Sequence, residues 1–506
     1  MRDYKIPTLN INKFSGKEFC CFSFSARDYR RLLLKNSNTM QLKNLLEKKE
    51  KVGKEIGSES YMPKSKHRFL KTVNLSNNFV LDETNIEYCK PENKIFAKKN
   101  EILIAKDGGG NGLGETCIYQ YDNIDNLDSL SAGIIAIKVK EEKRNYVFGF
   151  LKSQHFKDFV DLNTAQGSTI RHSKLVSLDY QIPFPTKNNN PNPENIEKLV
   201  SLIVQNIINK EEQIKAKNKQ IDYLIEKELE ENQKEDSFKY AYPRIGEIKE
   251  KIFRLDSGLH EKQVKEIDFE INNFSLGFFY ISDFFNYCRG QNLQVSQIGE
   301  SFYSDTPKDN FYRMFTNVEM QNDRTISGYR WLGNKNKLTT LPDNTVMLAA
   351  DGMIVGRAFF YDSMDNTITN IHPWIITAKD NNYPIFKRVF LCLFLSYLKN
   401  IGYLEKIKDK SNGGGLKKEH LNKWIKIPNF PEQKQQEIAK LYYNKVDRNI
   451  NSNLENYLEK EKLRNQEIGI FQLNMEIFTL REYLEKLVYK IVMEEEIKIE
   501  EYLEYI

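Results

Sequence analysis

Apolar residues recur every seven positions over two long stretches of the chain. The first stretch, residues 196–229, follows two prolines and places β-branched residues along one column, with further apolar residues three positions on. This spacing is typical of a coiled-coil helix, in which two positions of each heptad face a partner helix. The predicted seam consists of Val200, Ile203, Ile207, Ile214, Ile221 and Leu224, with Lys210 and Lys217 at two further seam positions.

The second stretch follows Pro431 and has the same period in two parts. The apolar columns are Tyr443, Ile450 and Tyr457 in one part and Leu463, Ile470, Ile477, Leu484 and Ile491 in the other. The step from Tyr457 to Leu463 is six residues, so the phase changes there, and Gly469 weakens the helix just beyond it. We expect the two stretches to pack against each other, because neither can bury its apolar stripe alone. The alternative, in which each packs on its own globular domain, stays open.

Outside these stretches the sequence repeats itself with a period near 244 residues. The first copy has NEILIAKDGGG from Asn100, and the second has NTVMLAADGMI from Asn344. Further along, residues 167–185 correspond to residues 413–431, with Ile182-Pro183 opposite Ile427-Pro428, and each block follows an apolar segment with a helical pattern. Several short blocks in one order predict a single architecture that is present twice.

The chain is therefore ordered as globular domain, helix, globular domain, helix. Runs of Val, Ile, Phe and Tyr between glycine and asparagine turns predict strands within the globular parts. The predicted fold class is α+β, with two tandem mixed α/β domains joined by two long helices that form an antiparallel coiled coil. The predicted segments are residues 1–190 and 237–430 for the domains, 191–236 for the first helix, and 431–506 for the second helix and an acidic C-terminal tail.

The glycine-rich stretch DGGGNGLGET at residues 107–116 comes close to a phosphate-binding loop. Such a loop needs a following helix and a lysine that reaches the phosphates, but Glu115 stands at the position of the lysine. The next residues, TCIYQYDN, have a strand pattern, and the second copy keeps only Asp351-Gly352 and Gly356. We therefore interpret both stretches as strand–turn–strand hairpins with Asp-Gly at a position that favours a positive φ. An ATPase built on this loop is a disfavoured alternative.

Composition and charge limit the possible functions further. The chain has 75 Lys and Arg against 70 Asp and Glu, a formal charge of only +5, but basic residues gather at 48–72 and 405–426. Local basic patches on a nearly neutral chain suit a protein that contacts nucleic acid over limited surfaces. The six cysteines and six histidines show no metal-ligand spacing, and the N-terminus has no apolar signal segment, so we expect a reduced, cytoplasmic protein without a metal. No catalytic motif is present, which predicts a non-catalytic chain.

The duplicated arrangement resembles the specificity subunit of type I restriction-modification systems. The resemblance rests on ILIAKDG with VMLAADG, on SAGIIAIKV with NIHPWIITA, on the two Ile-Pro blocks, and on PEQKQQEIAKLYYNKVDRNI at the start of the second helix. It implies that each globular part is a target recognition domain for one half of a bipartite, asymmetric double-stranded DNA site. It also implies that the paired helices set the distance between the two half-sites.

The same resemblance implies partner subunits. Two modification subunits, which would bind S-adenosylmethionine and methylate adenine, would dock on this chain, and a restriction subunit with translocase and nuclease activity would join them. No cofactor is expected on the chain itself. A helix of about 35–40 residues spans about 50–60 Å, whereas successive major-groove faces on one side of a duplex repeat every ~34–36 Å. A helix of this length with a recognition domain at each end can therefore address two half-sites more than one turn apart.

Polar turns in the two domains supply the candidate DNA contacts. Bases are read by Arg, Lys, Asn, Gln, Ser and Thr, whereas phosphates are held by Lys, Arg and backbone amides. The first domain offers Lys64, Lys66, His67, Arg68, Gln166, Ser168, Thr169, Arg171, His172 and Lys174. The second offers Arg330, Asn334, Lys335, Lys337, Lys410, Ser411, Asn412, Lys417 and Lys418. Trp331 fits a core position better than a stacking platform, and Asp107 and Asp351 are interpreted as turn residues.

Two other functions remain open at this point. One is the recognition subunit of a related, type IIB-like restriction system whose partner combines cleavage and methylation. The other is a coiled-coil scaffold with two protein-binding domains and no DNA contact, which gives no reason for the duplicated basic turns.

Overall fold

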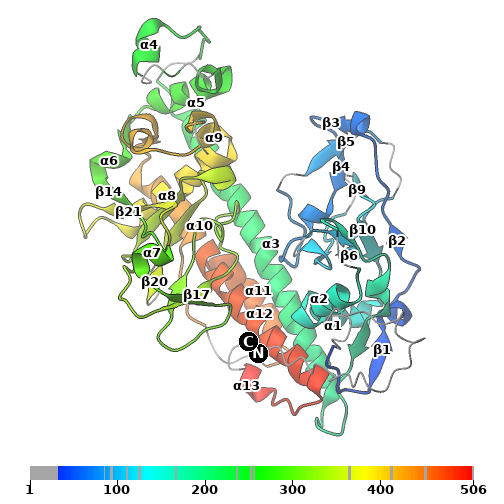
Figure 1. Ribbon diagram of the computed structural model, residues 1–506. Coiled ribbons are helices and arrows are strands. Elements are labelled where there is room, and N and C mark those ends of the chain that lie inside the picture. The colour runs from blue at the N-terminus through cyan, green and yellow to red at the C-terminus, as the bar shows by residue number, and fades with distance from the viewer. Residues whose placement is uncertain are drawn as a thin grey trace, which may run out of the picture. The chain divides into compact units, whose positions relative to one another are not determined.

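The computed structural model confirms the predicted α+β class. It describes residues 32–503 except 85, 92–94, 110–111, 123–126, 166–167, 235–236, 251–253, 255–256, 363–365, 411–413 and 449–452. The chain divides into two compact units (Figure 1). Unit 1 comprises Met1–Glu212, Asp447–Gln466 and Glu476–Ile506, and unit 2 comprises Gln213–Val446 and Glu467–Met475. Each unit thus combines one globular part with segments of the long helices.

The described residues of unit 1 form two four-stranded sheets and two strand pairs. The first sheet is antiparallel throughout and has the order β2 (Lys51–Val52), β10 (Ile134–Ile137), β6 (Ile102–Ala105), β8 (Thr116–Ile118). The second has the order β3 (Tyr61–Met62), β5 (Glu87–Cys89), β4 (His67–Leu70), β9 (Leu127–Leu130), and its β4–β9 pair is parallel. The strand pairs are β1 (Thr39–Gln41) with β12 (Gln181–Pro183) and β7 (Asp107–Gly108) with β11 (Arg171–His172).

Unit 2 repeats the topology of both four-stranded sheets. Its first sheet has the order β14 (Phe285–Arg289), β21 (Pro373–Ala378), β18 (Thr345–Ala349), β19 (Ala358–Tyr361) and is antiparallel throughout. Its second has the order β15 (Ser301–Ser304), β17 (Arg330–Asn334), β16 (Tyr312–Met314), β20 (Thr367–Ile368), again with a parallel pair at the end, β16–β20. Strand β13 (Phe278–Tyr280) pairs with β22 (Lys426–Pro428), and a bridge from Asp351 to Gly415 corresponds to the β7–β11 pair. The predicted internal repeat is therefore confirmed.

The same correspondence holds for the helices that cover the sheets. Unit 1 has α1 (Arg144–Lys152) and α2 (Gln154–Leu162), and unit 2 has α8 (Ile385–Asn400) and α9 (Tyr403–Ile407). Helix α8 packs on β18 and β19 and is buried along most of its length, as its apolar run predicts. Unit 2 also has α4 (Ile245–Glu250), α5 (Lys262–Asn272), α6 (Ile281–Phe284), α7 (Val295–Ile298) and α10 (Glu432–Tyr442).

Short helical turns join these elements. The 3-10 turns are Leu42–Leu45, Ser58–Ser60, Thr72–Asn74, Glu141–Lys143, Val176–Asp179, Ser257–His260 and Gly352–Ile354, and a π-helical turn covers His420–Trp424. No helix in the described ranges is long and apolar enough to cross a membrane.

The first long helix is continuous, but the second is not. Helix α3 (Pro193–Glu231) begins at a proline, a residue that the first helical turn tolerates because its missing N–H has no partner there. After Pro431 the chain forms α10, then α11 (Tyr457–Glu467), α12 (Ile470–Met493) and α13 (Glu500–Leu503). The expectation of one long second helix is corrected in this respect. The break between α11 and α12 contains Gly469, whose lack of a side chain lets it lie against the backbone of Tyr442.

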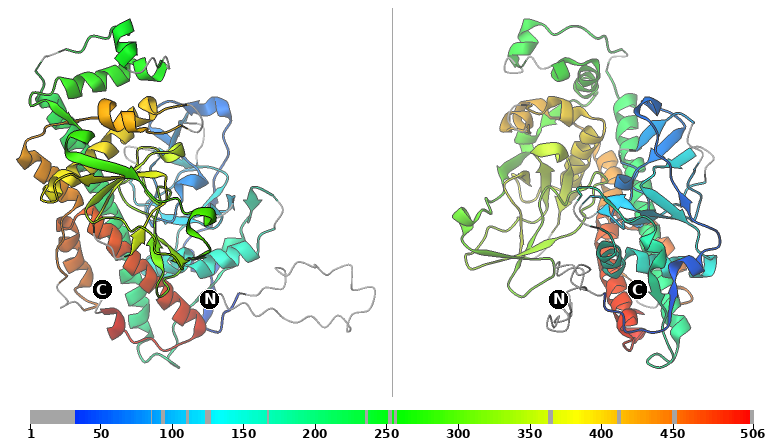
Figure 2. Two further views of the ribbon diagram at one scale, coloured as in Figure 1. Left: turned by 60° about the vertical axis from the view of Figure 1, so that its left-hand side comes forward. Right: turned by 45° about the vertical axis from the view of Figure 1, so that its right-hand side comes forward.

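Within unit 1, α3 and α12 run antiparallel (Figure 2). Lys210 in α3 bonds to Glu476 near the start of α12, whereas Asn190, just before α3, bonds to Ile497, just after α12. The predicted seam residues Val200, Ile203, Ile207, Ile214, Ile221, Tyr457, Ile470, Ile477 and Leu484 are buried, and Leu224 is half-buried. Ile450 lies outside the described residues.

Leu463 is a wrong assignment, because its side chain is 62% exposed. Helix α11 is separate from α12 and turns a different face inward, formed by Tyr457, Glu461 and Asn465. The heptad column therefore cannot be extended across the phase change. The sequence shows the slip but not which face of α11 is buried after it.

Both glycine stretches form hairpins rather than phosphate loops. In unit 1, β6 pairs with β8, and in unit 2, β18 pairs with β19. The left-handed glycine common to both is the later one, Gly114 with φ 76° and Gly356 with φ 85°, and each donates to the end of the preceding strand. Gly352 also has a positive φ, but Gly108 belongs to strand β7, so the Asp-Gly assignment is correct only in the second copy.

Candidate nucleic-acid interface

The β3–β4 turn of unit 1 exposes only part of the predicted basic cluster. Lys64 and Lys66 are exposed and His67 is half-buried, so these side chains remain candidates for DNA contact. Arg68 lies one residue further along β4 and points to the opposite face, because side chains alternate along a strand. Its side chain is buried, which removes it from the candidate set.

Arg68 is held by a buried ion pair that spans two strands. Its Nε donates to Asp128 at 2.6 Å, a second nitrogen donates to the other oxygen of that carboxylate, and a third donates to Glu83 at 2.7 Å. Tyr119 donates its hydroxyl to the same aspartate at 2.7 Å. Burial alone would lower the pKa of Arg68, but the two carboxylates outweigh it and raise the pKa. The guanidinium therefore serves the fold of unit 1.

The second turn of unit 1 surrounds strand β11. Ser168, Thr169 and Lys174 are exposed, whereas Gln166 lies outside the described residues. Arg171 is engaged with the end of α2, where it donates to the Asp161 carboxylate at 2.5 Å and to backbone carbonyls. His172 is exposed and lies 2.9 Å from Asp107 across the β7–β11 pair. This turn offers hydroxyls and one lysine to a ligand, and its arginine is a structural residue.

In unit 2 the first predicted turn lies at strand β17 and just after it. Lys335 and Lys337 are exposed, and so is Arg330, whose guanidinium lies 3.4 Å from Glu319. Asn334 instead donates to Glu300 and Ser301 and accepts from the backbone of Asn336, so it shapes the turn. Lys335 and Lys337 are therefore the cations of this turn that are most available to a ligand.

The second turn of unit 2 follows α9. Lys410 and Lys418 are exposed, and Lys417 forms an ion pair with Asp409. Ser411 and Asn412 lie outside the described residues. The DNA contacts of both turns stay predictions, with exposed lysines as the main cations.

One group was missed because it lies on a strand and not in a turn. Residues Phe302, Phe311, Arg313 and Trp331 lie on one face of the second sheet of unit 2, and we call this set the cation–aromatic face. The opposite face carries the buried cluster of Met314, Leu332 and Ile368 with their neighbours. Trp331 thus lies half-buried on the face away from that core, which corrects its assignment as a core residue. Alternation along β16 and β17 is the signal that could have identified this face.

The helices of unit 1 meet at a second polar cluster, which is buried. Lys210 of α3 is 1% exposed and donates to Glu461 at 2.9 Å, Asn465 at 2.7 Å and Glu476 at 2.7 Å. Arg464 pairs with the same Glu476. Burial alone would raise the pKa of Glu476, but the bonds from Arg464 and Lys210 lower it to about 2. Through these bonds the buried lysine connects α3 to both α11 and α12.

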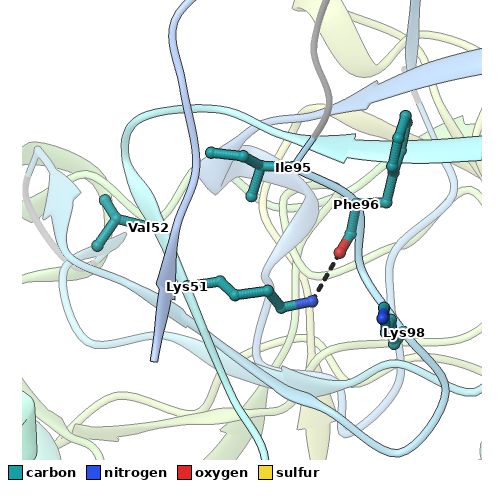
Figure 3. Close-up of a pocket in the computed structure, with 5 residues that line it drawn as sticks. All are labelled: Lys51, Val52, Ile95, Phe96 and Lys98. Atoms are coloured by element: carbon teal, nitrogen blue, oxygen red, sulfur yellow. Dashed lines mark hydrogen bonds between the residues drawn. The ribbon is translucent and has the colours of Figure 1, made fainter. Parts of the chain in front are cut away.

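A pocket of about 430 Å³ lies in unit 1, and Figure 3 shows the residues that line it. It is lined by Lys51, Val52, Ile95, Phe96 and Lys98, and the amine of Lys51 points to the backbone oxygen of Phe96. Lys51 donates to that oxygen at 2.7 Å and to Glu101 at 2.6 Å, so its charge is already used within the fold. The described residues also contain no group of three metal-ligating side chains. The pocket offers no catalytic arrangement.

Comparison with known proteins gives matches among solved structures. No family model and no curated protein matches the chain. The type I restriction-modification S subunit from M. genitalium is 14% identical with a TM-score of 0.41, and the match covers 91% of this chain and 97% of that one. The HsdS subunit from Thermoanaerobacter tengcongensis is 13% identical with a TM-score of 0.25, covering 90% and 96%. A chain from a study of assembly and conformational transition of the type I R-M system is 12% identical with a TM-score of 0.26, covering 91% and 98%.

Proposed function

We propose that this chain is the DNA sequence-specificity subunit of a type I restriction-modification complex. The observation that carries the proposal is the duplication, in which two units have the same three sheet topologies but different exposed side chains. Two copies of one scaffold with different surfaces suit the recognition of two unequal half-sites in DNA. The proposed target is therefore bipartite and asymmetric.

The chain itself would bind and not catalyse. Its exposed lysines at the β3–β4 turn and after β17 would hold phosphates, which gives affinity but little sequence information. The methyl donor S-adenosylmethionine would be bound by modification subunits that methylate adenine. A restriction subunit would complete the complex.

The long helices would set the gap between the two half-sites. Helix α3 has 39 residues, which corresponds to roughly 58 Å at about 1.5 Å per residue. The buried Lys210 cluster would keep the register of the helices constant, and with it the length of the gap. Exposed faces of these helices are the proposed docking surface for the modification subunits.

Methylome sequencing of a host that expresses this chain with its modification partner tests the proposal. We expect one gapped, two-part motif with a methylated adenine in each part, and its loss when this chain is omitted. A host that expresses the partner alone is the matched control. Absence of any motif that depends on this chain, with both proteins present and folded, would contradict the proposal.

A further inference from the structure

Corresponding arginines of the two units have different surroundings. Arg68 on β4 and Arg313 on β16 occupy the same place in their sheets, between one antiparallel and one parallel neighbour. Opposite Arg68 stand Tyr88 on one side and Asp128 on the other. The residues opposite Arg313 are Trp331, which is aromatic like Tyr88, and Thr367, which takes the place of the aspartate. The second unit therefore keeps the arginine and lacks its carboxylate partner.

The guanidinium of Arg313 forms no hydrogen bond and no ion pair with the described residues. It lies over two aromatic rings, 4.9 Å from the centroid of Tyr329 and 5.5 Å from that of Trp331. Its Nε is buried and has no hydrogen-bond partner. Aromatic rings hold a guanidinium in place without using its N–H donors. Among the described residues, Arg313 is thus a charged group that aromatic rings position and no carboxylate neutralises.

The surroundings of Arg313 are accessible and apolar toward the sheet edge. Phe302 on the edge strand β15 is 60% exposed and lies opposite Gly333. A side chain at Gly333 would collide with the Phe311 ring, which would lie 2.5 Å from its Cβ, so the glycine lets Phe311 pack against this face. Exposed lysines stand at the rim, with Lys308 near the Phe311 ring and Lys335 and Lys337 after β17.

We infer that Arg313 reads a base edge in the half-site bound by unit 2, and this inference rests on the proposed function. The occupant of the cation–aromatic face is then double-stranded DNA. A planar guanidinium in a fixed orientation suits bidentate contact with the O6 and N7 atoms of guanine, which is the commonest specific contact to DNA. The mobile lysines at the rim suit phosphates, which need charge but no fixed geometry.

The test uses the full chain with its modification partner and the motif that methylome sequencing gives for the wild type. Arg313→Gln removes both the charge and the planar pair of N–H donors. Arg313→Lys keeps the charge but not the planar pair of donors. For both variants we expect one fixed position in one half of the motif to become degenerate, while the other half stays unchanged. Binding of the wild-type duplex in fluorescence anisotropy should weaken by about 5- to 100-fold, the range for a lost bidentate pair.

Single base changes in the duplex separate the possible outcomes. For Arg313→Gln, the loss of affinity should disappear when the read base is already replaced. An equal loss on every duplex would assign Arg313 to a phosphate and would overturn the inference. An unchanged motif and affinity would overturn it as well. If the wild type gives no bipartite motif, the proposed function itself is wrong. This result is distinguishable from a failure of the inference about Arg313, in which the wild type gives the motif and the variants do not change it as expected.

Thr367→Asp gives an independent test that keeps the arginine. This substitution recreates in unit 2 the carboxylate that Asp128 provides in unit 1, so it should capture Arg313 and give the same degenerate position. Thermal melting establishes that the variant is folded. A folded Thr367→Asp protein with the wild-type motif would contradict the inference.

Discussion

In unit 1 the arginine on β4 lies beside an aspartate, whereas in unit 2 the arginine on β16 lies beside a threonine. A second pair of positions shows the same kind of exchange. After the left-handed glycine of each hairpin, unit 1 has Glu115, which pairs with Lys157 at 2.6 Å, and unit 2 has Arg357. The backbone is preserved in both places while the charges change. The topology of these units is therefore compatible with different charge arrangements, which is what two different binding surfaces require.

The loop at residues 76–78 in unit 1 and the corresponding loop at residues 320–322 in unit 2 are held by different cations. In unit 1, Lys152 is fully buried and donates to the carbonyls of Ser76, Asn78 and Thr116. In unit 2, Arg357 donates to Met320 and Asn322, and Lys399 donates to Asn322 at 2.6 Å. In unit 1 one lysine binds the backbone carbonyls, while Lys157 and Arg481 reach the side chains of Asn77 and Asn78 only at 3.4 Å. In unit 2 two cations share the loop. This difference leads to predictions of unequal size for the two units.

Asp128→Asn should have the largest effect, because it leaves the buried Arg68 with only half of its neutralising charge. We expect unit 1 to lose about 3–5 kcal/mol of unfolding free energy, the usual cost of breaking a buried ion pair. Urea denaturation of the chain measures the loss, and hydrogen exchange of β4 locates it. Asp122→Asn is the matched control, since Asp122 pairs with Lys99 at an exposed site. Equal stability of Asp128→Asn and wild type would show that Arg68 does not need its partner.

Lys152→Met should cost about 2–4 kcal/mol, because three carbonyls lose their donor and the carbonyl of Thr116 stays buried. Lys399→Met should cost less, since Arg357 still holds the corresponding loop of unit 2. Denaturation of both variants compares the two units directly. An equal cost would contradict the greater dependence of the unit 1 loop on Lys152.

The pH dependence of stability sharpens this comparison. Burial lowers the pKa of Lys152 to about 8 from its usual 10.5. Between these values the unfolded chain holds a proton that the folded chain has lost, so the unfolding free energy contributed by this group rises with pH. Lys152→Met should lack that rise, and Lys43→Met, at an exposed site, should keep it. Denaturation from pH 7.5 to 10 checks the difference.

Much of this architecture could be predicted from the sequence, because it depends on local periodicity. The repeat, the seam of α3 and the hairpin at residues 107–116 all follow from spacing of apolar residues and glycines. The partners of Arg68 could not be predicted, since Asp128 is sixty residues away and meets it only through a parallel strand pair. Arg313 is also absent from the predicted DNA contacts, because these are chosen from polar turns and Arg313 lies within a strand. The role of a charged residue on a strand depends on its neighbours in the sheet. The sequence does not show which strands become neighbours.

Glu476→Gln should have a smaller effect, because Lys210 keeps Glu461 and Asn465 as partners. We expect a loss of about 1–3 kcal/mol at pH 7, from the weakened pairs to Lys210 and Arg464. The pKa of Glu476 is lowered from 4.5 to about 2, so its contribution is present above pH 4.5 and is lost as the pH falls toward 2. The difference between variant and wild type should therefore shrink between pH 5 and pH 2.5. Glu455→Gln, at an exposed pair with Lys198, is the control.

Lys337→Gln should have the smallest effect, and it separates the rim of the cation–aromatic face from its centre. Lys337 is exposed, and removal of one phosphate contact weakens binding to all duplexes alike and lowers the slope of log affinity against log salt by about one. Fluorescence anisotropy of the complex in a salt titration measures that slope, with Lys335→Gln as a second rim variant. The methylation motif should stay unchanged in both, in contrast to Arg313→Gln. If a lysine variant instead made one motif position degenerate, a lysine at the rim would read that base. The difference between a fixed guanidinium and flexible lysine side chains would then not explain specificity.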